Sequence, residues 1–413
     1  MIRVGTPVTG GSETDKAVAR AVGVDAVVVG AGPAGTAFAL NLAPLHRVLV
    51  LDRRAGPAVR IGESLAPAAR RLLSDMGLWD AFLAEGHSPC HAGRSVWGGP
   101  LPVEADNLRD LDGPGWHLDR GRFDGWLRRV AASRGAVLQI PAQLLSVNRA
   151  GEGWLIEVET ASRRLPVHAR LLVDAGGRGS PLAKRFGARR AVSDRLVCGW
   201  VHGRDAPSRQ AGLTWIEAEP DGWWYSAPLP AGRRVVAFHT DADLPAAADA
   251  RDTASLLRRL SGCSVLSDSL RACGFEPEGQ EEGRGGFCAA HSSTLSPASG
   301  EGWLAVGDAA LGFDPLSSQG IFNALYTGLA AAEAAHRHLF GDPGALSGYA
   351  AGLTPIRDAY RAHLRAWYGL ERRWQDRPFW QRRLSIPLSP GGEGRGEGEA
   401  FRGSFRLCRT PSS

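Results

Sequence analysis

A glycine-rich turn between two apolar strands near the N-terminus constrains the fold more than any other feature of the sequence. The apolar run Val24–Val29 leads directly into Gly30–Gly35, which reads Gly-Ala-Gly-Pro-Ala-Gly. The next residues are typical of a helix, which Pro44 ends, and a second apolar run, Val48–Leu51, is followed by Asp52. Strand, glycine turn, helix, strand and acidic residue in this order predict a βαβ unit that binds a dinucleotide.

The positions within this unit have distinct expected roles. Gly30 permits the sharp turn, Gly32 lets the backbone approach a pyrophosphate, and Gly35 allows the helix to pack closely on the strand. The helix N-terminus offers free N–H groups and about half a positive charge to the phosphates. Asp52 is placed to bind ribose hydroxyls. The residues expected to bind the nucleotide here are Gly30, Gly32, Pro33, Ala34, Gly35, Asp52 and Arg53.

Length and composition indicate a globular protein. Of the 413 residues, 44% are hydrophobic and 22% are charged, so we expect one or two closely joined domains. No apolar run approaches the roughly 18 residues that span a bilayer, and the N-terminus lacks the apolar core of a signal peptide. The six cysteines include no Cys-x-x-Cys pair, so neither a zinc site nor a disulfide framework is indicated. These features predict a cytoplasmic protein with no metal and no membrane span.

The net charge of +5 is concentrated near the C-terminus. The segment Arg361–Leu384 contains seven arginines and two acidic residues, which alone give +5, so the remainder of the chain sums to zero. We therefore expect no nucleic-acid binding. A basic segment of this kind is usually a solvated helix face, and the alternative is that it helps to bind a partner.

A second glycine-rich junction lies far along the chain. The strand predicted at Trp303–Val306 runs into a Gly-Asp turn that contains Asp308, and Asp314–Gly320 then precedes a predicted helix that starts at Ile321. This arrangement resembles the second FAD signature of the aromatic-hydroxylase-like flavoproteins. The resemblance implies that Asp308 binds the ribityl chain of FAD. It also implies that the helix N-terminus at Gly320 and Ile321 faces the flavin ring, where reduced flavin carries negative charge.

Two further segments resemble elements of the same flavoproteins. Leu171–Ser180 is similar to their Asp-Ala-x-Gly-Arg-x-Ser element, and Trp116–Asp124 is similar to their Arg-x-x-Phe-Asp segment. The second likeness implies that Arg120 contacts the flavin or the pyrophosphate. Four signatures in the expected order imply FAD as the cofactor, with NAD(P)H or a reductase partner as the electron donor.

The predicted fold class is α/β, with a Rossmann-like FAD-binding domain of the aromatic-hydroxylase type interleaved with an antiparallel β-sheet substrate domain. Alternating residues and Pro-Asp-Gly and Pro-Ala-Gly turns between 212 and 240 favour the antiparallel sheet. A disordered leader is expected at 1–22 and a disordered, glycine-rich tail at 385–413. The FAD-binding domain is assigned to 23–80, 112–190 and 285–345, the substrate domain to 81–111 and 191–284, and C-terminal helices to 346–384.

The segment Arg60–Leu65 resembles the strap that runs between flavin and substrate in tryptophan halogenases and their relatives. The likeness gives Glu63 a reactive role and places Ser64 at the flavin; the alternative for Glu63 is a structural carboxylate that caps the next helix. Halogenases also need a lysine between flavin and substrate, but the only lysines are Lys16, in the leader, and Lys184. Their Trp-x-Trp-x-Ile-Pro motif is absent too. Both departures disfavour halogenation.

Direct oxygen transfer requires less of the protein. A flavin C4a-hydroperoxide gives its distal oxygen to an electron-rich ring, and the protein supplies a dry pocket, orientation and electrostatics. Tryptophans such as Trp224 are candidates for the pocket wall. His117 and His239 are candidate acid–base groups, although a lone histidine is more often structural. The sequence thus predicts an FAD-dependent monooxygenase with Glu63, His117 and Trp224 as candidate catalytic residues.

Four shorter sequence segments resemble a narrower group of flavoproteins. Gly62–Arg70, Gly86–Cys90, Gly115–Arg120 and Gly222–Ser226 resemble flavoproteins that mature tryptophan-derived quinone cofactors in amine oxidases and dehydrogenases. This implies that the aromatic substrate is a tryptophan side chain within a partner oxidase or dehydrogenase polypeptide.

The C-terminal helix fits such a partner. We expect its basic edge to help dock the polypeptide, while an apolar face packs on the protein. The residues expected on that face are Tyr360, Leu364, Trp367 and Trp374.

Three other functions stay open. A flavin-dependent tryptophan halogenase would depend on chloride or bromide. An FAD-dependent reductase, such as those that act on isoprenoid chains, would turn over without consuming oxygen. A non-catalytic FAD-binding maturation factor would still work after its cavity residues were altered.

Overall fold

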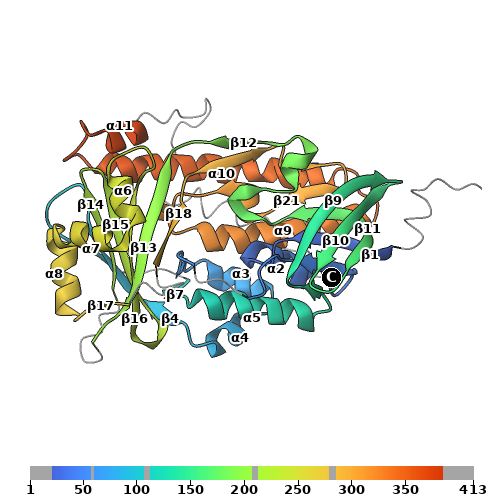
Figure 1. The fold of residues 1–413 in the computed structure, drawn as a ribbon, viewed down its shortest axis with the longest axis horizontal. Helices are drawn as coiled ribbons and strands as arrows, with labels where there is room; N and C mark the ends of the chain where they lie inside the picture. Colours follow the sequence, from blue (N-terminus) through green and yellow to red (C-terminus); the bar gives the residue numbers. More distant parts are fainter. Residues whose placement is uncertain (1–20, 57–59, 107–111, 207–212, 279–284, 385–413) are drawn as a thin grey trace, which may run out of the picture.

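The computed structural model describes residues 21–56, 60–106, 112–206, 213–278 and 285–384 (Figure 1). The expected tail and all but the last two residues of the expected leader lie outside this part of the chain. Val22, which the sequence assigned to the leader, already begins the first strand. The described residues form two large sheets at opposite ends of an elongated molecule, with long helices between and along them (Figure 1).

The first sheet belongs to the nucleotide-binding domain. Its parallel strands are β1 (Val22–Val29), β2 (Val48–Leu51), β8 (Val137–Gln139), β11 (Arg164–Asp174) and β21 (Trp303–Ala305). They lie in the order β21–β11–β1–β2–β8, and β20 (Ser299–Gly300) pairs antiparallel at one edge. The predicted strand, turn, helix and strand are therefore confirmed at the centre of a parallel sheet, where near-continuous apolar strands are buried on both faces.

An antiparallel extension and three helices complete this domain. β9 (Ala142–Ala150) and β10 (Gly153–Thr160) extend β11 as a meander. The helices are α2 (Pro33–Leu42), α5 (Arg120–Ser133) and α9 (Gly320–Leu339). α2 and α9 pack so closely that a Cβ atom added to Gly328 would lie 2.6 Å from the carbonyl oxygen of Ala34. Glycine at this position therefore sets the distance between the two helices that flank the nucleotide site.

The second sheet is the predicted antiparallel one, except that β14 (Thr214–Glu219) and β5 (Ala92–Val96) pair in parallel. It runs in the order β17–β13–β16–β15–β14–β5–β6, with β18 also paired to β13. Helices α6 (Ala246–Arg251), α7 (Thr253–Ser261) and α8 (Ser264–Ala272) cover its outer face (Figure 1, left). Its strands are β5 (Ala92–Val96), β6 (Val103–Asp106), β13 (Leu196–Arg204), β14 (Thr214–Glu219), β15 (Gly222–Leu229), β16 (Arg233–Asp241), β17 (Glu276–Pro277) and β18 (Gly285–Ala289).

One predicted domain boundary differs from the structure. The sequence assigned residues from 285 onward to the FAD-binding domain, but β18 pairs with β13 of the antiparallel sheet through its whole length. Two short sheets lie between the domains. One contains β3 (Ser64–Leu65), β7 (Gly115–His117) and β4 (Ser88–Cys90), and the other contains β12 (Arg189–Val192), β19 (Ser293–Ser296) and β22 (Leu311–Gly312).

The remaining helices include α3 (Ala69–Asp75), α4 (Trp79–Ala84), α10 (Ala345–Leu370) and α11 (Pro378–Leu384). α10 runs along the top of the molecule in Figure 1 from the nucleotide-binding domain toward the second sheet. The buried face of its C-terminal half carries Tyr360, Leu364 and Tyr368, at helical spacing. The expectation that Trp367 lies on this face is wrong, because Trp367 is 51% exposed. Trp374 follows the end of the helix.

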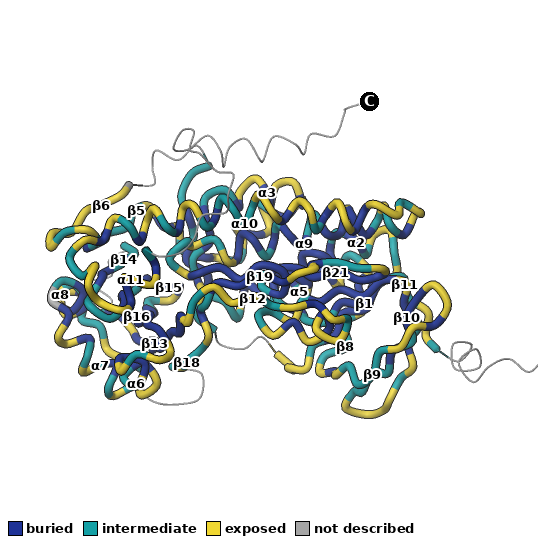
Figure 2. The backbone as a smooth tube through the Cα atoms, turned by 90° about the horizontal axis from the view of Figure 1, so that it is seen from above, coloured by how far each residue is buried: buried dark blue, intermediate teal, exposed yellow. Residues whose placement is uncertain are grey.

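Burial divides the described residues into two apolar clusters. The larger fills the nucleotide-binding domain and extends to the inner face of the second sheet, and the smaller lies between that sheet and α6–α8. Figure 2 shows the buried strands at the centre of both halves and the exposed residues on the outer turns. Among the described helices, none combines the length and apolar character needed to cross a membrane.

Candidate functional site

The fold requires glycine at two positions of the turn after β1, Gly30 and Gly35, but not at a third, Gly32. Gly30 has a φ of +116°, and a Cβ atom there would lie 2.3 Å from the carbonyl oxygen of Ala175. A Cβ atom on Gly35 would lie 2.0 Å from the carbonyl oxygen of Gly30. Gly32, in contrast, has an ordinary φ of −82° and open space where its Cβ would be. This open cradle at the N-terminus of α2 fits a bound pyrophosphate.

The start of α2 is suited to an anion. Pro33 occupies the first turn, no acidic residue lies in that turn, and the N-cap Gly32 provides no side-chain cap. Pro33, Ala34 and Gly35 are buried. The groups that this helix start offers to an anion are therefore backbone N–H groups.

Asp52 holds the glycine turn through its carboxylate. Its Oδ2 atom accepts a hydrogen bond from the backbone N–H of Ala31 at 2.9 Å, and its Oδ1 atom accepts one from Arg54 N–H at 2.9 Å. Arg128, on α5, donates from Nε to the carbonyl oxygen of Ala31 at 3.0 Å and lies 3.4 Å from Asp52 Oδ2. Arg53, the neighbour that the sequence also assigned to the nucleotide, is exposed.

Asp308 lies directly after β21, in the predicted Gly-Asp turn. Its carboxylate forms an ion pair with Arg178, with Nη1 and Oδ2 2.6 Å apart. Arg178 also donates to the carbonyl oxygens of Phe313, at 2.7 Å, and His291, at 3.2 Å. Asp308 keeps 29% of its side chain exposed, so the ion pair leaves part of the carboxylate free to accept hydrogen bonds from a polyol such as a ribityl chain.

The N-terminus of α9 lies just after this turn. Gly320 is its first residue, a Cβ atom added there would meet nothing within 4 Å, and Ile321 is buried behind it. The N-cap Gln319 makes no side-chain cap, and the first turn holds no acidic residue. The positive end of a 20-residue helix is therefore available to a partner with negative charge.

Arg120 holds the strap that precedes β3. Its Nε and Nη2 atoms bind the Asp124 carboxylate, each at 3.2 Å, and its Nη1 atom donates to the carbonyl oxygen of Gly62 at 2.9 Å. Gly62 has a φ of +103°, which favours glycine. The nearby carboxylates of Asp124, Glu63 and Asp308 outweigh burial and raise the pKa of Arg120. Arg120 is thus a permanent cation between the strap and the Asp308 turn.

Glu63 is buried at the centre of the strap. Its Oε2 atom accepts the backbone N–H of Gly62 at 2.8 Å, and its Oε1 atom lies 3.5 Å from Nε2 of His202, on β13. Both side chains are at least 95% buried. The structure therefore joins the strap of the nucleotide-binding domain to the inner face of the second sheet through a carboxylate and an imidazole.

A second polar contact crosses the same junction. Ser64 Oγ and Tyr225 Oη, on β15, are 2.8 Å apart. Burial and the charge of Glu63 raise the pKa of Tyr225, so its hydroxyl keeps its proton. Ser64 is directly opposite His117 in the β3–β7 pair. Ser64, Tyr225 and His117 therefore form one polar cluster beside Glu63.

His117 is buried and neutral. Burial, with the charge of Arg234 as a smaller cause, lowers the pKa of His117 to about 4. Its Nε2 atom lies 2.7 Å from Oγ1 of Thr214, and its Nδ1 atom has no hydrogen-bond partner among the described residues. His239, the other histidine singled out from the sequence, stacks on Trp223 with ring centres 3.7 Å apart, which is a packing role.

Trp224 does not join this cluster. It belongs to the apolar cluster under α6–α8, it is fully buried, and its Nε1 atom donates to Glu219 at 2.9 Å. Side chains alternate along β15, so Tyr225 faces the strap while Trp224 faces the opposite side. We correct the sequence-based expectation on this ground and assign Trp224 to the core of the outer layer.

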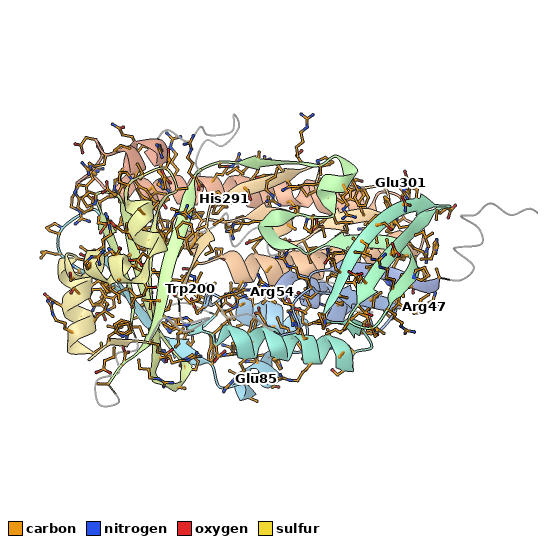
Figure 3. The ribbon with its side chains drawn as sticks, viewed as in Figure 1. Arg47, Arg54, Glu85, Trp200, His291 and Glu301 are labelled. Atoms are coloured by element: carbon orange, nitrogen blue, oxygen red, sulfur yellow. The ribbon has the colours of Figure 1, made fainter. Side chains whose placement is uncertain are left out.

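The other tryptophans divide in the same way. Trp200 is on the inner face of β13, with its ring 4.9 Å from that of His202, whereas Trp215 lies in the outer cluster. Figure 3 labels Trp200 and Arg54, which lie on the two sides of the region where the domains meet. Lys184 is exposed on the surface of the nucleotide-binding domain, and Lys16 lies outside the described residues.

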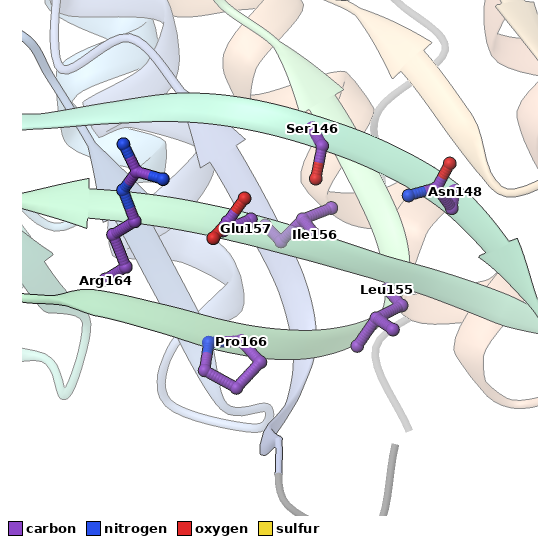
Figure 4. Close-up of a pocket in the computed structure, with 7 residues that line it drawn as sticks. All are labelled: Ser146, Asn148, Leu155, Ile156, Glu157, Arg164 and Pro166. Atoms are coloured by element: carbon purple, nitrogen blue, oxygen red, sulfur yellow. The ribbon is translucent and has the colours of Figure 1, made fainter. Parts of the chain in front are cut away.

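A pocket of about 350 Å³ lies elsewhere, on the outer face of β9–β11 (Figure 4). It involves the first half of β11, whereas the glycine turn follows the end of β1 that pairs with the last residues of β11. The pocket is therefore at the opposite end of the sheet from the candidate site. Its lining residues are Ser146, Asn148, Leu155, Ile156, Glu157, Arg164 and Pro166.

Four residues of the candidate site received no role from the sequence: Arg128, Arg178, His202 and Tyr225. Arg178 lay within a quoted motif but received no role. The alternation of β13 and β15 places His202 and Tyr225 on faces of their strands, but only the three-dimensional structure shows which face meets the strap. The contact between Arg128 and Ala31 could not be predicted from the spacing of the two residues in the sequence.

The fold and this geometry define an FAD-dependent oxidoreductase of the aromatic-hydroxylase and halogenase type. The sequence matches the family model described as FAD binding domain over residues 23–269, more than half of the chain. The chain belongs to this family.

Three relatives show the range of the superfamily. The putative FAD-dependent oxidoreductase LodB of Marinomonas mediterranea is 30% identical over 368 residues, which cover 87% of this chain and 96% of LodB. The solved structure of the myxobacterial chondrochloren halogenase CndH is 25% identical, with a TM-score of 0.77 over 93% of this chain and 89% of that chain. The peptidyl tryptophan dihydroxylase QhpG, essential for tryptophylquinone cofactor biogenesis, is 25% identical, with a TM-score of 0.69 over 89% and 80%.

Proposed function

We propose that this protein is an FAD-dependent monooxygenase that hydroxylates an electron-rich aromatic ring, namely a tryptophan side chain within a partner polypeptide. The observation that carries the proposal is the junction between strap and sheet. There Glu63, His202 and Tyr225 supply a carboxylate, an imidazole and a hydroxyl, and Lys184, the lysine within the described part of the chain, is exposed on the surface of the nucleotide-binding domain. The likeness to QhpG, whose name specifies a peptidyl tryptophan, supports the substrate class.

Binding of the cofactor is assigned to residues already placed. The open cradle at Gly32 and the N-terminus of α2 would hold the pyrophosphate of FAD, Asp52 would hold the ribose, and Asp308 would hold the ribityl chain. Bound FAD, reduced by NAD(P)H or a reductase partner, supplies the activation of dioxygen. Arg120 and the N-terminus of α9 would supply positive charge to the flavin ring of FAD.

Proton handling is assigned to the buried pair Glu63 and His202. The Gly62 N–H fixes one carboxylate oxygen of Glu63, and the other lies 3.5 Å from His202 Nε2. A proton passes between the two groups when substrate binding shortens this distance to about 3 Å. Tyr225 keeps its proton and donates a hydrogen bond toward the strap or a ring substituent. His117, held neutral, keeps a buried Nδ1 atom with no hydrogen-bond partner among the described residues, and this atom donates or accepts according to the tautomer.

The C-terminal region is assigned to partner binding. Trp367 and Leu370 are 51% and 54% exposed at the end of α10, on the flank away from Arg361 and Arg365. Aromatic residues are enriched at protein interfaces, so the exposed Trp367 supports a partner on its own flank of α10. A large polypeptide substrate needs such a surface because only its target side chain enters the site.

The test is co-expression with candidate partner polypeptides, namely amine oxidases or dehydrogenases of the same organism, under ¹⁸O₂, followed by mass spectrometry of the partner. We expect the mass of one or two ¹⁸O atoms on a tryptophan. Glu63→Gln should lower this incorporation by about a hundred-fold or more while FAD stays bound, because general acid–base groups contribute about that much. Glu301→Gln, at a carboxylate that is 88% exposed (Figure 3), is the matched control and should change nothing.

Halogenation is the competing function, and the likeness to CndH favours it. The same experiment with added bromide separates the two. Addition of bromine to the partner or to free tryptophan would replace the proposal, whereas oxygen incorporation that is independent of halide supports it.

A further inference from the structure

We propose that Cys198 and Cys288 are a redox-active thiol pair that closes to a cross-strand disulfide when it meets hydrogen peroxide. The pair lies on the wall of the candidate site. This inference rests on the proposed function in one respect, the biological source of the peroxide. A flavin monooxygenase releases hydrogen peroxide when the activated oxygen is not transferred to the substrate.

The register of the second sheet places the two cysteines directly opposite each other. Cys198 on β13 pairs with Cys288 on the antiparallel strand β18. Opposite residues of an antiparallel pair have Cα atoms about 4.5–5.5 Å apart, within the roughly 4.4–6.8 Å that a disulfide requires. Both thiols are free. Closing the bond therefore needs rotation of side chains and no rearrangement of the sheet.

Both side chains point to the inner face. Cys198, Trp200 and His202 alternate on β13 with residues that face the outer helices, and Cys198 and Cys288 both pack in the larger apolar cluster. The charge of Glu63 acts on both thiols. The pair is thus on the same face of the second sheet as the His202–Glu63 contact.

The two thiols have different roles. Cys288 is partly exposed, and a hydrogen bond from Cys198, with the nearby charge of Arg178, lowers the pKa of Cys288. Burial raises the pKa of Cys198, which is 1% exposed. An accessible thiol with a stabilised thiolate is the reactive member, and its buried neighbour resolves the product.

The chemistry balances with peroxide as the oxidant. The Cys288 thiolate attacks one peroxide oxygen, the O–O bond breaks, and hydroxide leaves, which becomes water with the proton of the Cys288 thiol. The sulfur of Cys198 then attacks the Cys288 sulfenic acid, the S–S bond forms, the S–O bond breaks, and a second water carries away the Cys198 proton. Two thiols lose two electrons in total, and one peroxide becomes two waters.

The chain supplies internal controls. Cys263 and Cys273 lie at opposite ends of α8, about 15 Å apart at 1.5 Å per residue, so they cannot bridge. Burial raises the pKa of Cys90 and of Cys263. These three thiols should stay reduced under conditions that oxidise the pair.

The test uses the full-length, FAD-loaded protein treated with hydrogen peroxide, denatured in N-ethylmaleimide, digested and analysed by mass spectrometry. We expect loss of alkylation at Cys198 and Cys288 together, a peptide that links them, and recovery of both thiols after dithiothreitol. In Cys198→Ala, dimedone should label Cys288, because the sulfenic acid lacks its resolving thiol. In Cys288→Ala, Cys198 should remain unlabelled and alkylatable.

The added peroxide keeps this result independent of any hydroxylation. A linked peptide supports the thiol pair even if no partner tryptophan is ever oxidised. The proposal is overturned if Cys198 and Cys288 remain fully alkylatable after peroxide, or if the Cys198→Ala protein, with its FAD content unchanged, gives no dimedone adduct on Cys288.

Discussion

The Arg178 guanidinium donates to the Asp308 carboxylate with Nη1 and Oδ2 2.6 Å apart, across 130 residues of sequence. This contact joins the turn after β11 to the turn after β21, the two neighbouring strands whose ends border the candidate cofactor site. Arg178 also holds the carbonyl oxygens of Phe313 and His291. Its position gives Asp308 a fixed orientation before any ligand binds, and preorganisation of this kind lowers the entropy cost of binding.

Removal of the Asp308 carboxylate should weaken FAD binding. In Asp308→Ala, the loss of a charge-assisted hydrogen bond of about 1.5–3 kcal/mol corresponds to a decrease in affinity of about ten- to a hundred-fold. Titration of the apoprotein with FAD, followed by flavin fluorescence, measures this change. Asp342→Ala removes a carboxylate that pairs with Arg337 near the far end of α9 and should leave the affinity unchanged. Equal affinities for the two variants would show that Asp308 is not a ligand.

Two glycines of the same turn should fail in different ways. Gly32 has an ordinary φ and open space, so Gly32→Val should fold normally and lose FAD. Gly35→Val forces side-chain carbon against the carbonyl oxygen of Gly30, from a Cβ position only 2.0 Å away, and should destabilise the fold itself. Circular dichroism melting of the two apoproteins, with flavin absorbance after reconstitution, separates these outcomes. A yellow Gly32→Val protein would contradict the assignment of the cradle.

The sequence was sufficient for local units and insufficient for contacts across the fold. β1, the glycine turn, α2 and β2 follow from a contiguous pattern, and the Asp308 turn follows from its own strand and helix. Trp224 was misplaced because a strand has two faces, and a shift of one residue exchanges core and site. The sequence of β15 is apolar on both faces, since one meets the strap region and the other meets α6–α8. Its pattern therefore could not indicate which side faces the nucleotide-binding domain.

Substitutions at the neighbouring residues Trp224 and Tyr225 should therefore have different effects, the first on stability and the second on catalysis. Trp224→Phe removes a buried hydrogen bond to Glu219 and part of the outer core, at a cost of about 1–3 kcal/mol in unfolding free energy, with turnover retained. Tyr225→Phe removes the 2.8 Å contact with Ser64 and should lower kcat with little change in FAD content. Thermal melting and oxygen-dependent turnover of both variants measure this. A lower kcat of Trp224→Phe at unchanged stability would show that Trp224 belongs to the catalytic site.

The last prediction concerns pH. Burial, with the charge of Asp194 as a further cause, raises the pKa of Asp314 to about 7 despite the opposing charge of Arg383, and Tyr368 donates to Asp314 Oδ2 at 2.8 Å. The unfolded chain binds this proton only below its ordinary pKa of 3.8. Between these values the folded state holds more protons than the unfolded state, so stability falls as pH rises toward 7 and then levels off.

Asp314→Asn should remove this dependence. The side chain of asparagine is neutral at every pH and keeps an oxygen for the Leu316 N–H, which donates to Asp314 Oδ1 at 2.9 Å. We expect the Tm of the wild-type protein to fall by a few degrees from pH 5 to pH 8 relative to that of Asp314→Asn, since each pKa unit corresponds to about 1.4 kcal/mol. Asp268→Asn, at a carboxylate that is 71% exposed, serves as the control and should follow the wild type. Parallel melting curves for wild type and Asp314→Asn across this range would mean that Asp314 is already ionised in the folded protein at pH 5, held there by Arg383 and its hydrogen bonds.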